Sequence, residues 1–269
     1  MKLWIITSGA ENLTLFKFLS QYDHEYIIYY DDLLFPYGDK PAAVVQAVIA
    51  DAILVLEKRG IDRIILSPVR ELVFRQHPKV FPLFQTYLKT YCFASSLVGK
   101  MGAIGDWSDM QVAQPLLETF VSEYVLKDNQ KKIKKFQTPF KRWIKETSLR
   151  KYFLSGLSYS DPLVNKIVKF DLRYFKDAGI DTLIPLNYGY FNYQNTITKF
   201  LNFKKIRFHK LEKVEIIFQW LVTSFEWSGT NNYLVKILYT GQKELLERQK
   251  KIMWMLQRGE SIKVQREKI

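Results

Sequence analysis

The stretch Lys58-Arg59-Gly60-Ile61-Asp62-Arg63-Ile64-Ile65-Leu66 decides the fold, because the chain contains a second version of it. That version is Asp177-Ala178-Gly179-Ile180-Asp181-Thr182-Leu183-Ile184-Pro185. Each copy follows an apolar segment that begins near a proline, Pro41 in the first case and Pro162 in the second. We interpret the pair as an internal repeat. The alternative is chance similarity between two ordinary α/β crossovers, since short motifs have low specificity.

The residues before each glycine have the spacing of one helix face. They are Val45, Val48, Ile49, Ala52, Ile53 and Leu56 in the first copy, and Val164, Ile167, Val168, Leu172 and Phe175 in the second. We expect Gly60 and Gly179 to end these helices, because glycine reaches the left-handed conformation without a Cβ clash. A helix, a glycine and a buried strand make half of a βαβ unit. Two copies therefore predict an α/β protein with two similar lobes.

The rest of the chain alternates between further strands and helices. We expect strands at residues 3–6, 25–30, 91–94, 101–105, 205–209 and 233–239, and helices at about 13–19, 81–91, 112–126, 190–201, 214–225 and 242–256. The charged tail from residue 257 should be frayed. Loops at the carboxyl ends of parallel strands surround the usual binding crevice of such folds. Thr7-Ser8-Gly9 and Pro36-Tyr37-Gly38 are therefore candidates to line it.

Composition limits the class of protein. The chain has 269 residues, 48% of them hydrophobic, which is enough for one large or two modest domains with a real core. It has no uncharged apolar run of about 18 residues, so we expect no transmembrane segment. The N-terminus has the pattern of a strand and carries no small-residue cleavage site. We therefore expect a cytoplasmic protein.

Cysteine and histidine usage argues against a metal centre. The single cysteine, Cys92, excludes an intrachain disulfide and a multi-cysteine zinc site. The histidines His24, His77 and His209 lack paired ligand spacing. We expect no metal. Cys92 should be an inert, buried apolar residue within a strand.

The formal net charge of +13 favours acidic partners such as an acidic protein or nucleic acid. Much of the excess lies in the basic segment, residues 127–151, where Phe136, Phe140 and Trp143 alternate with cations. These cations are Lys131, Lys132, Lys134, Lys135, Lys141, Arg142 and Lys145. One interpretation is a nucleic-acid contact with stacking aromatics. The other is a solvated face in a lysine-rich protein, because basic runs alone are weak signals.

The order of the motifs resembles glutamate racemase and the wider aspartate/glutamate racemase family. The stretch from Thr7 to Thr14 is similar to the family's D-S-G-x-G-G-L-T opening, Pro36-Tyr37-Gly38 matches its P-Y-G loop, and both Gly-Ile-Asp strands fall where its strands lead to catalytic motifs. The resemblance implies two pseudo-symmetric, Rossmann-like α/β lobes with mainly parallel sheets and a cleft between them. We expect residues 1–98 plus 212–269 in one lobe and residues 99–211 in the other.

The family is cofactor-independent and uses one cysteine from each lobe, since inversion at Cα needs a base on one face and an acid on the other. The resemblance places Pro68 and Asn187 at the two cysteine positions and Thr7 at the family's aspartate. Proline has no titratable group, and asparagine is not a base near neutral pH. We therefore expect no catalytic residues of the family type and no cofactor.

The resemblance also identifies candidate ligand-binding residues. Ser8, Tyr37 and Gly38 match positions that hold the amino acid's carboxylate, whereas Arg70 and Tyr188 replace threonines of the family motifs. Residual binding of a small carboxylate ligand and formation of a homodimer are both compatible with the resemblance.

Three functions are compatible with these residues. The first is a racemase-like protein that has lost racemisation and acts by binding a partner or ligand. The second is an enzyme with altered acid/base residues, using the loop carboxylates Asp31, Asp32, Asp106 and Asp109 if burial raises their pKa; these are otherwise turn and cap residues. The third is nucleic-acid association through the basic segment.

One structural observation discriminates between the first two functions. Two carboxylates that face each other across an open crevice would favour the enzyme, and a crevice filled by Trp107, Tyr188 and Arg70 would disfavour it.

Overall fold

The computed structural model describes residues 2–7, 15, 25–31, 37–92, 101–128, 144–146, 162–203, 205–208, 211–223, 234–239 and 263–268. Within these residues the strands form a five-stranded sheet, in the order β3-β1-β2-β7-β8, and a three-stranded sheet, in the order β5-β4-β6. All neighbouring strands are parallel. The five-stranded sheet contains β1 (Lys2–Thr7), β2 (Glu25–Tyr30), β3 (Arg63–Ile65), β7 (Leu234–Tyr239) and β8 (Lys263–Lys268), and the three-stranded sheet contains β4 (Met101–Gly105), β5 (Ile144–Glu146) and β6 (Thr182–Pro185).

The helix–glycine–strand prediction is confirmed in both copies. Helix α2 (Ala42–Glu57) precedes Gly60, whose φ is 72°, and helix α7 (Pro162–Ala178) precedes Gly179, whose φ is 62°. The strands that follow, β3 and β6, are edge strands that pair with the inner strands β1 and β4 of the two sheets. Each also forms one further parallel bridge, to Val80 and to Arg207 respectively. The two stretches therefore have the same local structure in two different sheets.

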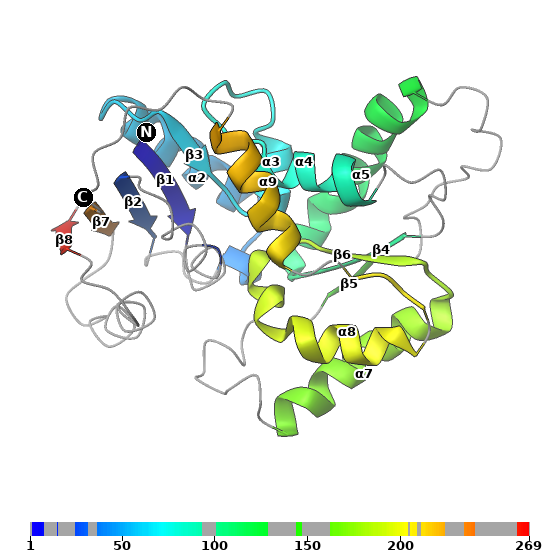
Figure 1. The fold of residues 1–269 in the computed structure, drawn as a ribbon. Helices are drawn as coiled ribbons and strands as arrows, with labels where there is room; N and C mark the ends of the chain where they lie inside the picture. Colours follow the sequence, from blue (N-terminus) through cyan, green and yellow to red (C-terminus); the bar gives the residue numbers. More distant parts are fainter. Residues whose placement is uncertain are drawn as a thin grey trace.

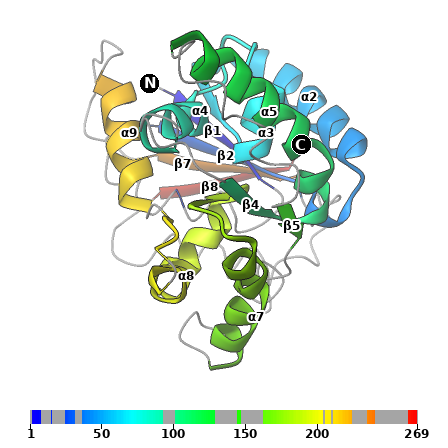
Figure 2. The ribbon, with the colours of Figure 1, turned by 90° about the vertical axis from the view of Figure 1, so that its right-hand side faces the viewer.

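The remaining helices pack around the sheets. They are η1 (Tyr37–Asp39), α3 (Pro68–Val73), α4 (Leu83–Tyr87), the π-helix η2 (Leu88–Cys92), α5 (Trp107–Asp128), the 3-10 helix η4 (Tyr188–Tyr193), α8 (Gln194–Asn202) and α9 (Leu211–Thr223). Figure 2 shows α2 and α5 on one side of the molecule and α7 and α8 on the opposite side of the three-stranded sheet. Among the described residues no helix is long and apolar enough to cross a membrane.

Successive residues of β1 point to opposite faces of the five-stranded sheet. Trp4 and Ile6 pack in a cluster with the buried residues of α2. Leu3 and Ile5 belong to a second cluster, which continues through α3, α4 and α9 into the three-stranded sheet and the buried faces of α5 and α7. One hydrophobic core therefore joins the two sheets.

Three secondary-structure expectations are wrong. Tyr91 and Cys92 end the π-helix rather than form a strand, because buried Leu88 and Cys92 hold the helical path against the β-propensity of the stretch. The charged tail is not frayed throughout, since β8 pairs with β7, and charged residues suit a strand at the sheet edge. The strand expected at residues 205–209 is a single bridge at Arg207. The helices expected at 13–19 and 242–256 lie outside the described residues apart from Leu15. The lobe boundaries remain a prediction.

Candidate functional site at the junction of the two sheets

The candidate residues after β2, β3, β4 and β6 lie on elements that begin at the carboxyl ends of these strands, where ligands bind in α/β folds. Pro68 and Arg70 lie on α3 after β3, and Asp106 and Asp109 lie at the start of α5 after β4. Asn187 and Tyr188 follow β6. The structure describes Thr7 as the last residue of β1 and Gly38 as part of η1, whereas Ser8 lies outside the described residues. The described candidate residues therefore lie at or after the carboxyl ends of the strands, and their role in binding remains a prediction.

A buried guanidinium connects the two sheets. Arg70 is 2% exposed, its Nη2 donates a hydrogen bond to Ser108 Oγ, and the same nitrogen lies 3.4 Å from Asp109 Oδ1. Because α3 follows β3 and α5 follows β4, this contact joins elements of different sheets. We call Arg70, Ser108 and Asp109 the intersheet cluster. Its charges are withdrawn from water, so loss of either charged partner would leave the other buried alone.

Two other contacts hold α5 against the five-stranded sheet. Arg75 Nη2 on the segment after α3 lies 3.0 Å from Glu123 Oε1 on α5, and the backbone N–H of Ala42, at the start of α2, donates to Gln111 Oε1 at 2.7 Å. The Arg75–Glu123 pair is more exposed to solvent than the Arg70–Asp109 pair. The intersheet cluster is thus the buried member of a series of contacts along α5.

The buried position of Arg70 disfavours the charged form of its guanidinium group. Burial lowers the pKa of the Arg70 guanidinium from its ordinary value, and neighbouring Asp109 counteracts this effect. The group still remains a cation, because arginine is not deprotonated in proteins. Its buried Nη1 has no hydrogen-bond partner among the described residues. This nitrogen can therefore donate to an acceptor that enters the junction.

The candidate carboxylates already have partners. Asp31 Oδ2 accepts a hydrogen bond from the Tyr37 hydroxyl at 2.8 Å, and Asp106 Oδ1 accepts one from the Tyr190 hydroxyl at 3.3 Å. Asp109 is the ion-pair partner of Arg70. Asp32 lies outside the described residues. The three described carboxylates are therefore engaged in local contacts rather than held as a pair of free bases.

Pro68 and Asn187 have structural explanations. Pro68 is the first residue of α3, where its missing N–H and its fixed φ are tolerated. Asn187 precedes η4, and its Oδ1 accepts a hydrogen bond from the backbone N–H of Gly189 at 2.7 Å. Both side chains are buried. Neither brings an acid or a base to the end of its strand.

Tyr188 and Glu71 form a second buried group. Tyr188 is 1% exposed and stacks on Phe191, with ring centroids 6.3 Å apart. Burial, and then the charge of Glu71, raise the pKa of the Tyr188 hydroxyl, and this hydroxyl has no hydrogen-bond partner among the described residues. Glu71 comes from the five-stranded sheet side and Tyr188 from the three-stranded side. Their electrostatic coupling places both near the junction.

Glu71 is the residue that sequence reasoning missed. It is fully buried, its Oε2 accepts from the Phe84 N–H at 2.7 Å, and its Oε1 accepts from the Gln85 N–H at 2.8 Å. Burial raises the pKa of Glu71 to about 8. The carboxyl group thus fixes the start of α4. The signal was a lone acidic residue between Val69 and Leu72 on a buried helix.

Cys92 interacts with Tyr87, whose hydroxyl is in turn electrostatically coupled to Tyr188. Cys92 is 1% exposed at the end of the π-helix. Burial raises the pKa of its thiol to about 12, so the reactive thiolate is scarce near neutral pH. Of the three side chains expected to fill the junction, Arg70 and Tyr188 are buried there, whereas Trp107 is 40% exposed. The cations of the basic segment lie outside the described residues, except that Lys145 lies on β5.

No protein-family model and no curated protein matches the sequence. Solved structures do match. The glutamate racemase of Francisella tularensis in complex with D-glutamate has a TM-score of 0.73 and 17% identity, covering 100% of this chain and 97% of its own. The chain has the glutamate racemase fold.

Two further structures agree with this assignment of the racemase fold. The glutamate racemase of Thermus thermophilus in complex with β-chloro-D-alanine has a TM-score of 0.70 and 18% identity, covering 100% of this chain and 97% of its own. The enzyme of Aquifex pyrophilus has a TM-score of 0.63 and 20% identity, covering 98% of both chains. The predicted α/β class with mainly parallel sheets is confirmed. At these identities the racemase fold is what is shared.

Proposed function

We propose that this chain is a binding protein that keeps the racemase fold and has lost amino-acid racemisation. The observation that carries the proposal is the intersheet cluster, in which a buried cation joins the ends of strands β3 and β4. A racemase needs these strand ends free to receive a substrate between an acid and a base. In this chain the side chains of Arg70, Ser108 and Asp109 lie between these strand ends, where a racemase would bind its substrate.

The chemistry of the junction supports the same conclusion. Pro68 and Asn187 stand where the resemblance puts the two thiols, and neither side chain transfers protons near neutral pH. Cys92 does not replace them, because burial raises the pKa of its thiol to about 12 and it lies on the π-helix after α4. Asp31, Asp106 and Asp109 are each engaged with a tyrosine or an arginine. Glu71 and Tyr188 are the other titratable groups at the junction, but both are buried and both carboxyl oxygens of Glu71 accept hydrogen bonds from the backbone of α4. We therefore do not assign the two required proton transfers to any described pair of groups.

One observation favours a retained ligand. The Nη1 atom of Arg70 is buried and has no hydrogen-bond partner among the described residues, and arginine binds carboxylates well. The ligand would be a small carboxylate held by Arg70, with Tyr188, Tyr37, Gly38 and Ser8 as the other candidate contacts. An enzyme with altered acid/base residues is the competing proposal for the same junction.

Hydrogen exchange at the substrate's Cα separates these proposals. Purified protein is incubated in deuterated water with L- or D-glutamate and with L- or D-aspartate, and loss of the Cα proton is followed by NMR. We expect exchange at the rate of the protein-free control. The glutamate racemase of Thermus thermophilus serves as the positive control. Protein-dependent exchange that disappears in the Asp109→Asn variant would instead establish an enzyme with altered residues.

A further inference from the structure

Helices α7 and α8 carry a second charged surface, which consists of residues outside the basic segment. We call it the cationic face. It consists of exposed cations on both helices and on the turn after α8: Lys166, Lys169, Arg173, Lys176, Lys199 and Lys205. Among the described residues, none of these six side chains forms an ion pair. Residues 182–211 contain no aspartate or glutamate, so little negative charge compensates the α8 side.

The two helices bring these cations together. Helices α7 and α8 lie side by side (Figure 1), and the Thr196 hydroxyl donates to Asn165 Oδ1 at 2.8 Å between them. At 3.6 residues per turn, Lys169 and Lys176 lie within about 40° of Asn165 around α7. They therefore stand on the side of α7 that faces α8. By the same count the buried residues Val168, Leu172 and Phe175 lie within about 80° of Asn165 in the other direction, so the two lysines border the buried stripe of α7.

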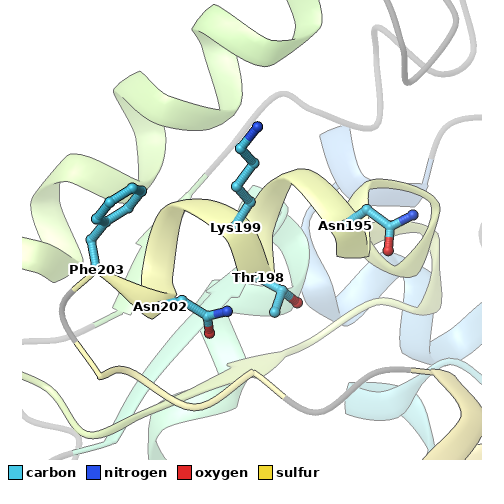
Figure 3. Close-up of a pocket in the computed structure, with 5 residues that line it drawn as sticks. All are labelled: Asn195, Thr198, Lys199, Asn202 and Phe203. Atoms are coloured by element: carbon cyan, nitrogen blue, oxygen red, sulfur yellow. The ribbon is translucent and has the colours of Figure 1, made fainter.

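An open hollow of about 450 Å³ lies on α8 beside these cations, lined by Asn195, Thr198, Lys199, Asn202 and Phe203. Figure 3 shows Phe203 and Lys199 projecting from the same side of the helix. The Phe203 ring is 84% exposed. The Thr198 hydroxyl has no hydrogen-bond partner among the described residues. The hollow thus combines one aromatic ring, one cation and several hydrogen-bonding groups.

We propose that the cationic face binds single-stranded nucleic acid. Lysine and arginine side chains neutralise phosphates, an exposed aromatic ring stacks on a base that is not paired within a duplex, and asparagine side chains hydrogen-bond to base edges. The net charge of +13 adds long-range attraction. An anionic membrane fits less well, because insertion of Phe203 would remove the exposed side chains of Asn195 and Asn202 from water.

Binding is measured with the full chain by fluorescence anisotropy, using labelled single-stranded DNA and RNA of mixed sequence. If four cations contact phosphates, affinity should fall by about 50-fold between about 50 and 200 mM salt. Lys169→Glu combined with Lys199→Glu should weaken binding by at least tenfold. The matched control is Lys58→Glu combined with Lys213→Glu, which changes net charge equally at exposed positions directly after α2 and on α9. It should weaken binding several-fold less.

A second pair of variants tests the ring. Phe203→Ala should weaken binding about tenfold while leaving the salt dependence unchanged, and Phe203→Trp should restore it. The proposal is overturned by undetectable binding at low salt, by equal losses in the two charge variants, or by binding to phosphatidylglycerol vesicles but not to oligonucleotides. Loss of binding only on replacing Lys131 and Lys135 would also overturn it. The result is independent of the Cα exchange assay.

Discussion

Arg70 lies beside the first turn of α5, where the helix dipole is positive and a cation is disfavoured. Asp109 lies in the same turn and compensates both charges, and Ser108 accepts a hydrogen bond from the guanidinium. The stability of this arrangement depends on all three side chains. A neutral residue of similar volume cannot replace Arg70, because it would leave the buried carboxylate of Asp109 without its cation.

Arg70→Ala should therefore destabilise the protein by about 3 to 5 kcal/mol, because it leaves Asp109 buried without its cation. Urea denaturation gives the free energy of unfolding. The control is Arg75→Ala, which removes the more exposed pair with Glu123 between the same regions and should cost about 1 kcal/mol or less. Asp109→Asn in the Arg70→Ala background should recover part of the loss. Equal losses for the two arginine variants would show that the intersheet cluster has no special role.

At the scale of the element, Gly60 and Gly179 both have a positive φ after a helix, directly after α7 in the case of Gly179 and three residues beyond the end of α2 in the case of Gly60. A Cβ at either glycine would meet no atom within 4 Å, so the requirement for glycine comes from the positive φ alone. The two positions should therefore respond to substitution in the same way, although they precede strands of different sheets.

Gly60→Ala and Gly179→Ala should each lower the free energy of unfolding by about 1 to 2 kcal/mol, the cost of left-handed backbone for a residue with a Cβ. Gly60→Asn and Gly179→Asn should cost less, because asparagine tolerates this conformation. Gly102 is the contrasting position, since its Cβ would lie 2.7 Å from Ile180 Cδ1. There asparagine should be worse than alanine. Losses at the caps that grow with side-chain size would contradict the backbone explanation.

Elements that form because of their own residue pattern could be predicted from the sequence, whereas elements that form through contacts with distant residues could not. Helices α2 and α7 and strands β1, β2 and β4 were predictable, because their own apolar spacing matches the buried faces. Strand β8 was not, since pairing with β7 alone makes its charged residues extended. The positions of Arg70, Asp109 and Tyr188 after strands were predictable. The hydrogen bonds that Glu71 accepts from the backbone N–H groups of α4 were not, because they depend on residues that pack together only in the fold.

At the scale of the molecule, one core and several polar contacts join the two sheets. The larger hydrophobic cluster runs from β1 through α3, α4 and α9 to β4 and β6. Helix α5 is attached to the five-stranded sheet side through Ala42, Arg70 and Arg75. If the proposed function is right, racemase chemistry in this chain would need both new acid/base groups and room between the sheets.

Pro68→Cys combined with Asn187→Cys should give no efficient racemase. The thiols would stand at the two positions that the resemblance identifies, but Arg70, Ser108 and Asp109 would still occupy the junction. Replacement of Asn187 would also remove the hydrogen bond to the Gly189 N–H. Cα exchange of glutamate in deuterated water measures the outcome, and circular dichroism confirms that the variants fold.

A third substitution, Arg70→Thr, separates the two obstacles. If the intersheet cluster is what blocks the substrate, the triple variant should exchange the Cα proton faster than the double variant. Arg70→Thr alone should show no exchange, because it opens space without supplying an acid and a base. Fast exchange by the double variant would mean that an amino acid reaches both thiols while the Arg70–Asp109 pair is intact. In that case the absence of thiols at positions 68 and 187 would be sufficient to explain the absence of exchange that we expect for the unsubstituted protein.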